Sequence, residues 1–334
     1  MKISKCQTSD GTYYFSAPLV VNIQLSNYCP LKCPFCFMPQ NERRDMPMTM
    51  LTSLLKELSD IGCRTILYGQ GEPMVSGDIL KAVELAHNAS FNVRIATSGA
   101  GCTYNKLRRL YELGLTELHV SINSFNRSVN QSTRVGYDLA VNTLKLATSL
   151  GIRTKLNYVA QSDTIDMFPE YIQHAMNYHV DGINILREKV NRHGEIGKYT
   201  KEDLDKLAQH IKNSDIPIEI EECFCELKLY LPEHKKSALQ GCSAGKAMMA
   251  IGSDGRYFPC SHLPSKAESF SCVKDYWTCS ETLMKLREVH LTEEPCRNCI
   301  NVDRCTPCQA IYRDDKHSYH KSRVDCSSFM RKDG

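Results

Sequence analysis

Three cysteines, Cys29, Cys33 and Cys36, lie close together near the start of the 334-residue chain, separated by three and two residues. Their segment directly follows an apolar, β-branched run. Three thiolates can ligate three irons of a cubane cluster and leave the fourth iron open, whereas a structural zinc site usually has four protein ligands. The spacing therefore indicates an iron-sulfur site that accepts an outside ligand. The alternative is a zinc knuckle completed by Cys6 or Cys63.

The chain holds 17 cysteines in all, a high count that favours metal ligation or redox chemistry over disulfides if the protein is intracellular. Seven of them lie at short spacings in the last third of the chain: Cys242, Cys260, Cys296, Cys299, Cys305, Cys308 and Cys326. This pattern predicts a second metal-binding region. Tetrahedral zinc also uses two-residue spacings, so a pair of zinc sites is the alternative.

Short apolar strands alternate with amphipathic helices along the first two thirds of the chain, a pattern typical of parallel βα units. The predicted strands are 19–25, 65–68, 91–97, 117–122, 154–159, 182–186 and 216–221. The predicted helices are 50–61, 79–88, 104–113, 137–150, 167–178 and 200–213. A cysteine-bordered hairpin (248–251 and 257–259) and one helix (280–290) precede a loop-rich tail. We expect an α/β fold in which the three cysteines stand at the carboxyl ends of the strands.

Polar and glycine-rich motifs follow three further strands. They are Gly71, Glu72 and Pro73 after 65–68, Ser98 after 91–97, and Ser121 and Asn123 around the end of 117–122, followed by Arg134. These segments lie at successive strand ends, as the cysteine loop does. A guanidinium suits a carboxylate ligand. Taken singly, each motif is also an ordinary turn.

The cysteine spacing and these motifs together resemble the radical S-adenosylmethionine (SAM) superfamily. Phe35 fills the aromatic place before the last cysteine, the segment at Glu72 is similar to the family's Gly-Gly-Glu-Pro motif with Gln70 in place of one glycine, and Asn123 stands where Asp is common. The resemblance implies a 4Fe-4S cluster on Cys29, Cys33 and Cys36 that chelates SAM. It also implies SAM contacts from Phe35, Gly71, Glu72, Pro73, Ser98, Ser121, Asn123 and Arg134.

The seven-cysteine tail resembles the SPASM extension of such enzymes, which holds auxiliary clusters. The resemblance implies two auxiliary 4Fe-4S clusters, one on Cys242, Cys260 and Cys308 and one on Cys296, Cys299, Cys305 and Cys326. It leaves the first cluster without a fourth cysteine. Cys223, Cys225, Cys272 or Cys279 could supply it, or the site could be open to substrate. Cys223 and Cys225 are also possible hydrogen donors to a substrate radical, or buried packing residues.

The expected architecture is a partial (β/α)6 TIM-type barrel with a small C-terminal cysteine-rich iron-sulfur domain. We divide the chain into an N-terminal extension (1–18), the radical SAM barrel (19–235) and the SPASM-like domain (236–334). The net charge of +3 is too small to indicate a nucleic-acid partner. The apolar run 17–23 is too short to span a membrane, so we expect a cytoplasmic protein.

The resemblance implies hydrogen abstraction from a carbon of a peptide and an oxidative modification, a thioether or carbon-carbon crosslink, in ribosomal peptide maturation. An electron donor such as flavodoxin or ferredoxin would serve it. Few residues precede the first strand, so a separate peptide-recognition protein is a further expected partner. The alternatives are a dehydrogenase or epimerase acting on a sugar, aminoglycoside or other metabolite, a peptide epimerase with a Cys hydrogen donor, and a non-catalytic metal-binding protein.

Overall fold

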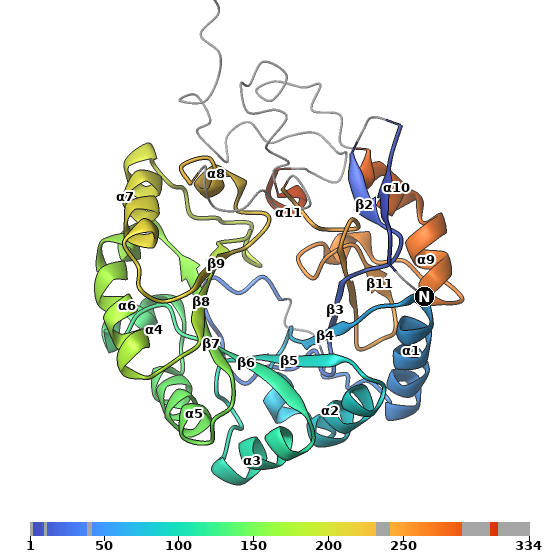
Figure 1. Ribbon diagram of the computed structural model, residues 1–334, viewed down its shortest axis with the longest axis horizontal. Helices are drawn as coiled ribbons and strands as arrows, with labels where there is room; N and C mark the ends of the chain where they lie inside the picture. The colour runs from blue at the N-terminus through green and yellow to red at the C-terminus, as the bar shows by residue number, and fades with distance from the viewer. Residues whose placement is uncertain (1–2, 10–11, 39–41, 232–240, 289–307, 313–334) are drawn as a thin grey trace, which may run out of the picture.

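The computed structural model describes residues 3–9, 12–38, 42–231, 241–288 and 308–312. A curved sheet encloses the centre of the molecule, and helices cover its outer face (Figure 1). Seven strands of this sheet follow the predicted βα pattern: β3 (Val20–Ile23), β4 (Thr65–Tyr68), β5 (Asn92–Thr97), β6 (Leu115–Ser121), β7 (Thr154–Ala160), β8 (Gly182–Arg187) and β9 (Ile218–Ile220). Each pairs in parallel with the next. The fold is thus α/β, a partial TIM-type barrel.

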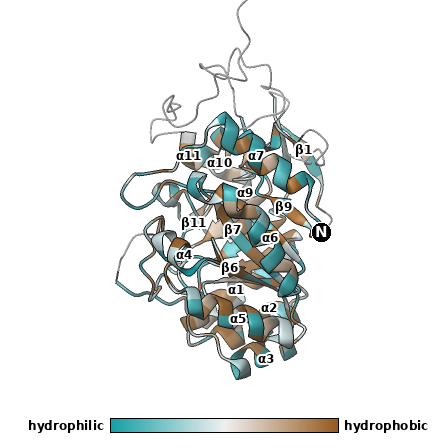
Figure 2. Cartoon of the chain, turned by 90° about the vertical axis from the view of Figure 1, so that its left-hand side faces the viewer, coloured by the Kyte–Doolittle hydropathy of each residue, from teal (hydrophilic) through white to brown (hydrophobic). Residues whose placement is uncertain are grey.

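Amphipathic helices connect the strands. They are α1 (Met48–Ile61), α2 (Ile79–Asn88), α3 (Tyr104–Glu112), α4 (Arg127–Thr133), α5 (Tyr137–Ser149), α6 (Phe168–Asn177) and α7 (Lys201–Lys212), with short 3-10 turns at Pro73–Val75 and Ser162–Met167. Gly62 ends α1 in the left-handed conformation, and Thr200 and Asp203 form a capping box that starts α7. The helices turn apolar faces inward and polar faces outward (Figure 2). Local sequence therefore fixes both the ends and the orientation of these helices.

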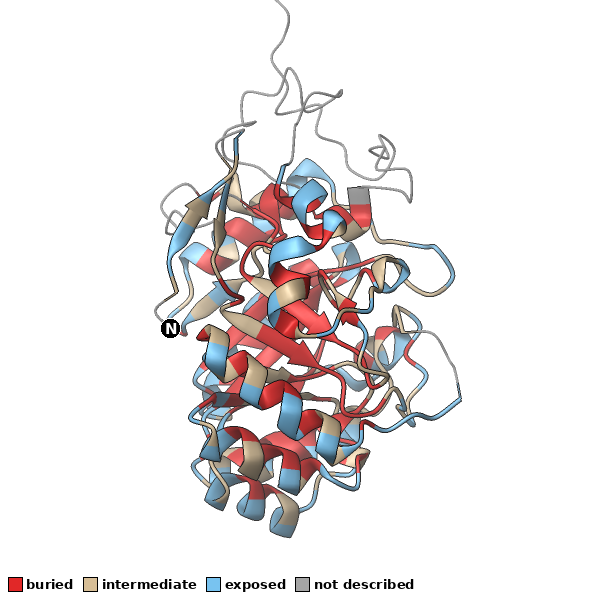
Figure 3. Ribbon diagram, turned by 90° about the vertical axis from the view of Figure 1, so that its right-hand side faces the viewer, coloured by how far each residue is buried: buried red, intermediate tan, exposed pale blue. Residues whose placement is uncertain are grey.

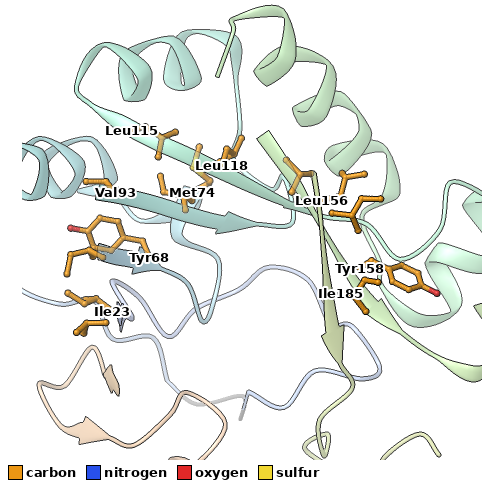
Figure 4. Close-up of a cluster of buried hydrophobic side chains, with 14 of the residues drawn as sticks. Ile23, Tyr68, Met74, Val93, Leu115, Leu118, Leu156, Tyr158 and Ile185 are labelled. Carbon is orange, nitrogen blue, oxygen red and sulfur yellow. The ribbon is translucent and has the colours of Figure 1, made fainter. Parts of the chain in front are cut away.

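The main core lies between the sheet and the helices. Strand residues that alternate along the chain, such as Val93 and Ile95 on β5, are fully buried there. Side chains from successive strands meet in this layer (Figure 4). Buried residues follow the strands through the molecule, while the outer faces of the helices are exposed (Figure 3). The opposite face of the sheet carries polar side chains, including Asn22, His119 and Asn184.

The C-terminal segment joins the same sheet. Strand β10 (Met248–Ile251) pairs in parallel with β3, and β11 (Tyr257–Phe258) pairs antiparallel with β10, so the strand order is β11-β10-β3-β4-β5-β6-β7-β8-β9. The predicted hairpin is therefore present, and it extends the barrel sheet. The remaining C-terminal elements are a 3-10 turn (Pro264–Lys266), α9 (Val273–Cys279), α10 (Glu281–Arg287) and α11 (Gln309–Tyr312), after the short α8 (Cys225–Lys228).

Several elements were not predicted from the sequence. Strands β1 (Lys5–Gln7) and β2 (Tyr13–Phe15) pair within the expected N-terminal extension, and helices α4 and α9 were missed. The helix predicted over 280–290 begins at Glu281 and ends at Arg287. These elements are short, and short elements depend more on tertiary contacts than on local pattern. For example, the Trp277 indole of α9 donates to the carbonyl of Phe15 on β2 (2.9 Å).

Candidate active site

The three-cysteine loop follows β3 and stands at the carboxyl ends of the strands, as expected. Cys33 is buried, whereas Cys29 and Cys36 are partly exposed. The Cys36 amide donates to the Cys33 carbonyl (3.2 Å). Arg192, after β8, donates its guanidinium to the Cys33 carbonyl (3.0 Å) and its amide to the Cys36 carbonyl (3.1 Å). The loop is therefore held both from within and from across the barrel.

A cation lies beside these thiols. Burial raises the pKa of Cys29 to about 11 and also raises the pKa of Cys33, but Arg134 opposes the shift at Cys33. The Arg134 guanidinium also lies over the Phe35 ring, 4.8 Å from its centroid. Metal ligation requires thiolates, which an adjacent guanidinium stabilises. Arg134 and Phe35 therefore belong to the same site as the cysteine loop.

Glu72 joins two of the predicted motifs. Its buried carboxylate accepts hydrogen bonds from the Thr97 hydroxyl (2.7 Å), the Met74 amide (3.1 Å) and the Ser98 amide (2.7 Å), and from the Ser98 hydroxyl. Burial nevertheless raises its pKa. The Glu72 amide donates to the carbonyl of Tyr28, next to Cys29 (2.9 Å). Glu72 thus ties the loops after β4 and β5 to the start of the cysteine loop.

Gly71 provides the close approach between these loops. It has φ +65°, and a Cβ at this position would lie 2.3 Å from the Ser26 carbonyl and 2.9 Å from the Tyr28 carbonyl. Gln70 before it also has a positive φ, of 64°, and Pro73 begins the 3-10 turn that follows. The backbone at Gly71 lies so close to the start of the cysteine loop that a side chain at this position would push the two segments apart.

The segment after β6 forms its own network. The Asn123 side chain donates to the Thr133 hydroxyl (3.1 Å) and accepts from the Val159 amide (3.3 Å) and from Arg134 Nε (3.4 Å). Ser121 is buried at the end of β6. Asn123 therefore orients Arg134, a function that the sequence did not suggest.

A second group of thiols, the four-thiol site, consists of Cys223, Cys242, Cys260 and Cys308. The thiols of Cys223 and Cys242 both lie within hydrogen-bonding reach of that of Cys308, and Cys260 packs against this buried group. The hydrogen bond with Cys308 lowers the pKa of Cys242 to about 6, whereas burial raises that of Cys260 to about 12. Three of these cysteines were predicted to share a cluster, and the structure brings Cys223 to them.

The other predicted or alternative ligands lie elsewhere. Cys225, in α8, directs its thiol to the Glu222 carbonyl (3.6 Å). Cys272 caps the start of α9, and Cys279 is exposed at its end. The Cys63 thiol faces the carbonyls of Leu19 and Thr65, at the strand ends opposite the cysteine loop. Cys296, Cys299, Cys305 and Cys326 lie outside the described residues.

The two thiol groups are connected through His262. Its ring packs at a tilt against Phe37, which follows Cys36, with centroids 3.9 Å apart and an interplanar angle of 37°. Its Nδ1 lies 3.7 Å from the Cys260 thiol, and its amide donates to the same sulfur (3.4 Å). Burial, reinforced by Lys189, lowers the pKa of His262 to about 3, so the ring is neutral. Neither His262 nor Lys189 carried a sequence signal, because both stand outside the motifs.

Within the described residues, no three His, Cys, Asp or Glu side chains meet as ligands of one metal ion. A cubane cluster differs from a single ion because each thiolate binds a different iron. The described helices also include none that is long and apolar enough to cross a membrane.

A comparison with family models matches one part of the chain. Residues 23–175 match the family model of the Radical SAM superfamily. This part of the chain is a radical SAM domain. It spans the cysteine loop, Glu72, Asn123 and Arg134.

Solved structures share the fold over more than this domain. SuiB of Streptococcus suis, solved with S-adenosylmethionine, has a TM-score of 0.78 and 20% identity over 92% of this chain and 77% of SuiB. The same protein has been solved with the precursor peptide SuiA. The protein anSMEcpe, solved with AdoMet and a Cp18Cys peptide, has a TM-score of 0.69 and 18% identity over 93% of this chain and 94% of its own. The likeness includes the region beyond the radical SAM domain.

Proposed function

We propose that this chain is a radical SAM enzyme with auxiliary clusters that oxidises a carbon of a peptide substrate, forming a thioether or carbon-carbon crosslink in ribosomal peptide maturation. The four-thiol site carries the proposal. A second cluster beside the radical SAM site offers a place for the electron that a substrate radical must lose during oxidation. The peptide substrate is supported by the peptides bound to SuiB and anSMEcpe.

The residues around the cysteine loop fit a cluster with bound SAM. Cys29, Cys33 and Cys36 would ligate three irons, and SAM bound at the fourth supplies, on one-electron reduction, a 5'-deoxyadenosyl radical that removes a hydrogen atom. Arg134 would hold the carboxylate of SAM, since its guanidinium stands beside the thiols. Glu72 would orient the loop backbone that faces the SAM amine, with Gly71, Pro73 and Ser98 shaping the same pocket edge. Asn123 would support Arg134, and Ser121 lies buried at the end of the preceding strand β6.

The four-thiol site fits a fully ligated auxiliary cluster. Cys242, Cys260 and Cys308 were the expected ligands, and Cys223 has the position of the fourth. Four cysteines leave no iron open, so the substrate would exchange an electron with this cluster without binding to it. As a ligand, Cys223 is not available as a hydrogen donor. Cys225 is separately bonded to Glu222, so we favour oxidation over epimerisation.

A matched pair of variants tests the fourth ligand. Cys223→Ala should remove the iron and sulfide of one cluster after anaerobic reconstitution, because a thiolate ligand is lost. Cys225→Ala, two residues away and equally buried, should keep the full content. Both should still release 5'-deoxyadenosine with dithionite, since the cysteine loop is intact. Equal iron in C223A and the parent protein would exclude Cys223 as a ligand, and zinc without sulfide in the parent would overturn the enzyme proposal.

The reaction itself is tested with a candidate precursor peptide. Oxidation should lower the product mass by two hydrogen atoms, with no deuterium from deuterated water at the reacting carbon. Solvent deuterium at that carbon with an unchanged oxidation state would instead identify an epimerase.

A further inference from the structure

Strands β6, β7 and β8 carry polar side chains on the face of the sheet that is turned away from the helices. Leu156 on β7 and Ile185 on β8 lie in the core between the sheet and the helices (Figure 4). Because side chains alternate along a strand, Asn157 and Asn184 lie on the opposite, inner face, together with His119 of β6. These three residues are only 8% to 9% exposed. Polar side chains at this depth need hydrogen-bond partners.

The three side chains form one hydrogen-bonded row. The Glu117 carboxylate accepts a hydrogen bond from His119 Nε2 (2.5 Å), so Nδ1 of the neutral ring is left as an acceptor. The Nδ2 atom of Asn184 lies 3.4 Å from this Nδ1 and also donates to Asn157 Oδ1 (2.9 Å). The donors of Asn184 and the acceptor of Asn157 are therefore used within the row, which fixes the orientation of both amides.

The row leaves one donor and one acceptor unused. Within the part of the chain that the structure describes, neither Asn157 Nδ2 nor Asn184 Oδ1 has a hydrogen-bond partner. Both atoms reach open space, unlike the Oδ1 atom of Asn22 on the same face, which is enclosed without a partner. An N–H donor beside a carbonyl acceptor is complementary to an amide, which offers both groups, whereas a carboxylate only accepts and an ammonium only donates.

The two amides lie next to the site around the cysteine loop. In the sheet register, Asn157 is opposite Ser121 of β6, and Asn184 is opposite Asn157. Two residues further along β7, the Val159 amide donates to the Asn123 side chain (3.3 Å). Two residues of a strand span about 7 Å. The amide pair therefore lies one layer closer to the amino ends of the strands than the residues proposed to hold SAM.

We propose that Asn157 and Asn184 bind an amide group of the peptide substrate and so position the reacting carbon beside SAM. The proposal rests on the proposed function, which supplies the peptide. Asn157 donates to the carbonyl of the substrate amide, and Asn184 accepts from its N–H group. The amide belongs either to the peptide backbone or to an Asn or Gln side chain, and substituted peptides distinguish these two sources.

Kinetics of the anaerobically reconstituted, full-length enzyme with a candidate precursor peptide test this contact. Asn157→Asp keeps the size of the side chain and its bond from Asn184 but replaces the free donor with an acceptor. It should raise KM for the peptide by about tenfold or more, because a buried carbonyl of the substrate loses its partner. Asn184→Leu should raise KM similarly through loss of the acceptor. Calorimetric affinity for SAM should stay within about threefold of the parent value in both variants.

Asn92→Leu is the matched control. Asn92 lies on the same face of the sheet, but it is exposed at the amino end of β5. This variant should keep the parent KM for the peptide.

Two sets of altered peptides identify the bound amide. Replacing each Asn or Gln of the peptide with Leu removes a side-chain amide, whereas an ester in place of a peptide bond removes a backbone N–H. The alteration that raises KM with the parent enzyme but has no further effect with Asn184→Leu marks the amide that Asn184 contacts.

An unchanged KM for the peptide in both N157D and N184L, at full iron content, would overturn the inference. A loss of SAM affinity as large as the loss for the peptide would also overturn it, because the pair would then belong to the SAM site. If the parent enzyme releases 5'-deoxyadenosine but modifies no candidate peptide, the proposed function fails instead.

Discussion

Gly71 shows how strongly single residues are constrained at this site. The residue has a positive φ, and its missing Cβ leaves room for the carbonyls of Ser26 and Tyr28. Gly71→Ala should therefore destabilise the fold by more than about 2 kcal/mol and weaken SAM binding, because the loop after β4 must move away from the cysteine loop. Urea unfolding and calorimetric titration with SAM measure the two effects.

Gly77 provides the control for this substitution. It lies six residues further on, and nothing stands within 4 Å of where its Cβ would be. Gly77→Ala should leave stability and SAM affinity within about 0.5 kcal/mol of the parent values. Equal behaviour of the two variants would show that the contact at Gly71 does not shape the site.

The positions of some site residues could be predicted from the sequence, because these residues come directly after a predicted strand. The cysteine loop, Glu72 and Ser98 each follow a parallel strand directly, so their meeting at one edge could be predicted. Cys223 could be proposed as one of several ligands, but choosing it required knowing that β10 pairs with β3 and brings Cys242 close. His262 and Lys189 lie near the site only because distant parts of the chain meet in the fold, so no local sequence pattern indicated them.

Elements of the barrel are joined by buried charges as well as by the sheet. Glu117 on β6 is 2% exposed and meets Arg94 of β5 (3.5 Å) and Lys155 of β7 (3.6 Å), together with His119 (2.5 Å). Despite burial, which acts the other way, the His119 hydrogen bond and these cations lower the pKa of Glu117 from 4.5 to about 2. The carboxylate therefore links three adjacent strands.

Replacing this carboxylate should lower the free energy of unfolding by an amount that depends on pH. The folded pKa lies below the unfolded value, so the stabilisation is complete above about pH 4.5 and is lost as the pH falls toward about 2. Glu117→Gln should destabilise the metal-free, reduced protein by on the order of 2 to 3 kcal/mol at neutral pH, and by less below about pH 4. Urea unfolding at several pH values measures this difference.

Glu219→Gln is the comparison for the same network. Glu219 pairs with Lys155 (2.7 Å), but its side chain is 67% exposed. Loss of the Glu219 charge should therefore lower the free energy of unfolding by less than about 1 kcal/mol. A penalty for E117Q that stayed constant down to pH 3 would mean that its effect comes from packing and not from charge.

The bounds of elements with a regular hydrophobic pattern were predicted accurately. The strand Thr65–Tyr68 and the helix Ile79–Asn88 have the predicted bounds, because alternation or amphipathic spacing runs through their whole length. Strands β1 and β2 have three residues each, half exposed, and carry too little pattern to be recognised. Such elements form because partners elsewhere in the chain cover them.

At the scale of the molecule, the sheet makes the barrel and the C-terminal segment one structure. Strand β10 covers the edge of β3, and the Phe15 amide of β2 donates to the Lys246 carbonyl (2.8 Å) just before β10. The domain boundary predicted near residue 235 therefore does not separate two sheets. Burial of shared surface on both sides makes unfolding of one part without the other unfavourable.

The single tryptophan of the chain tests this coupling directly. Trp277 is buried in the C-terminal segment, so its fluorescence reports that segment, while far-ultraviolet circular dichroism is dominated by the barrel. The two signals should change at the same urea concentration in the intact protein. Ala250→Pro should uncouple them, because Ala250 lies opposite both Asn22 of β3 and Phe258 of β11, and proline cannot donate within the sheet. In this variant, the fluorescence signal should change at a lower urea concentration than the circular dichroism signal. Separate transitions in the unmodified protein would show that the C-terminal segment folds independently of the barrel.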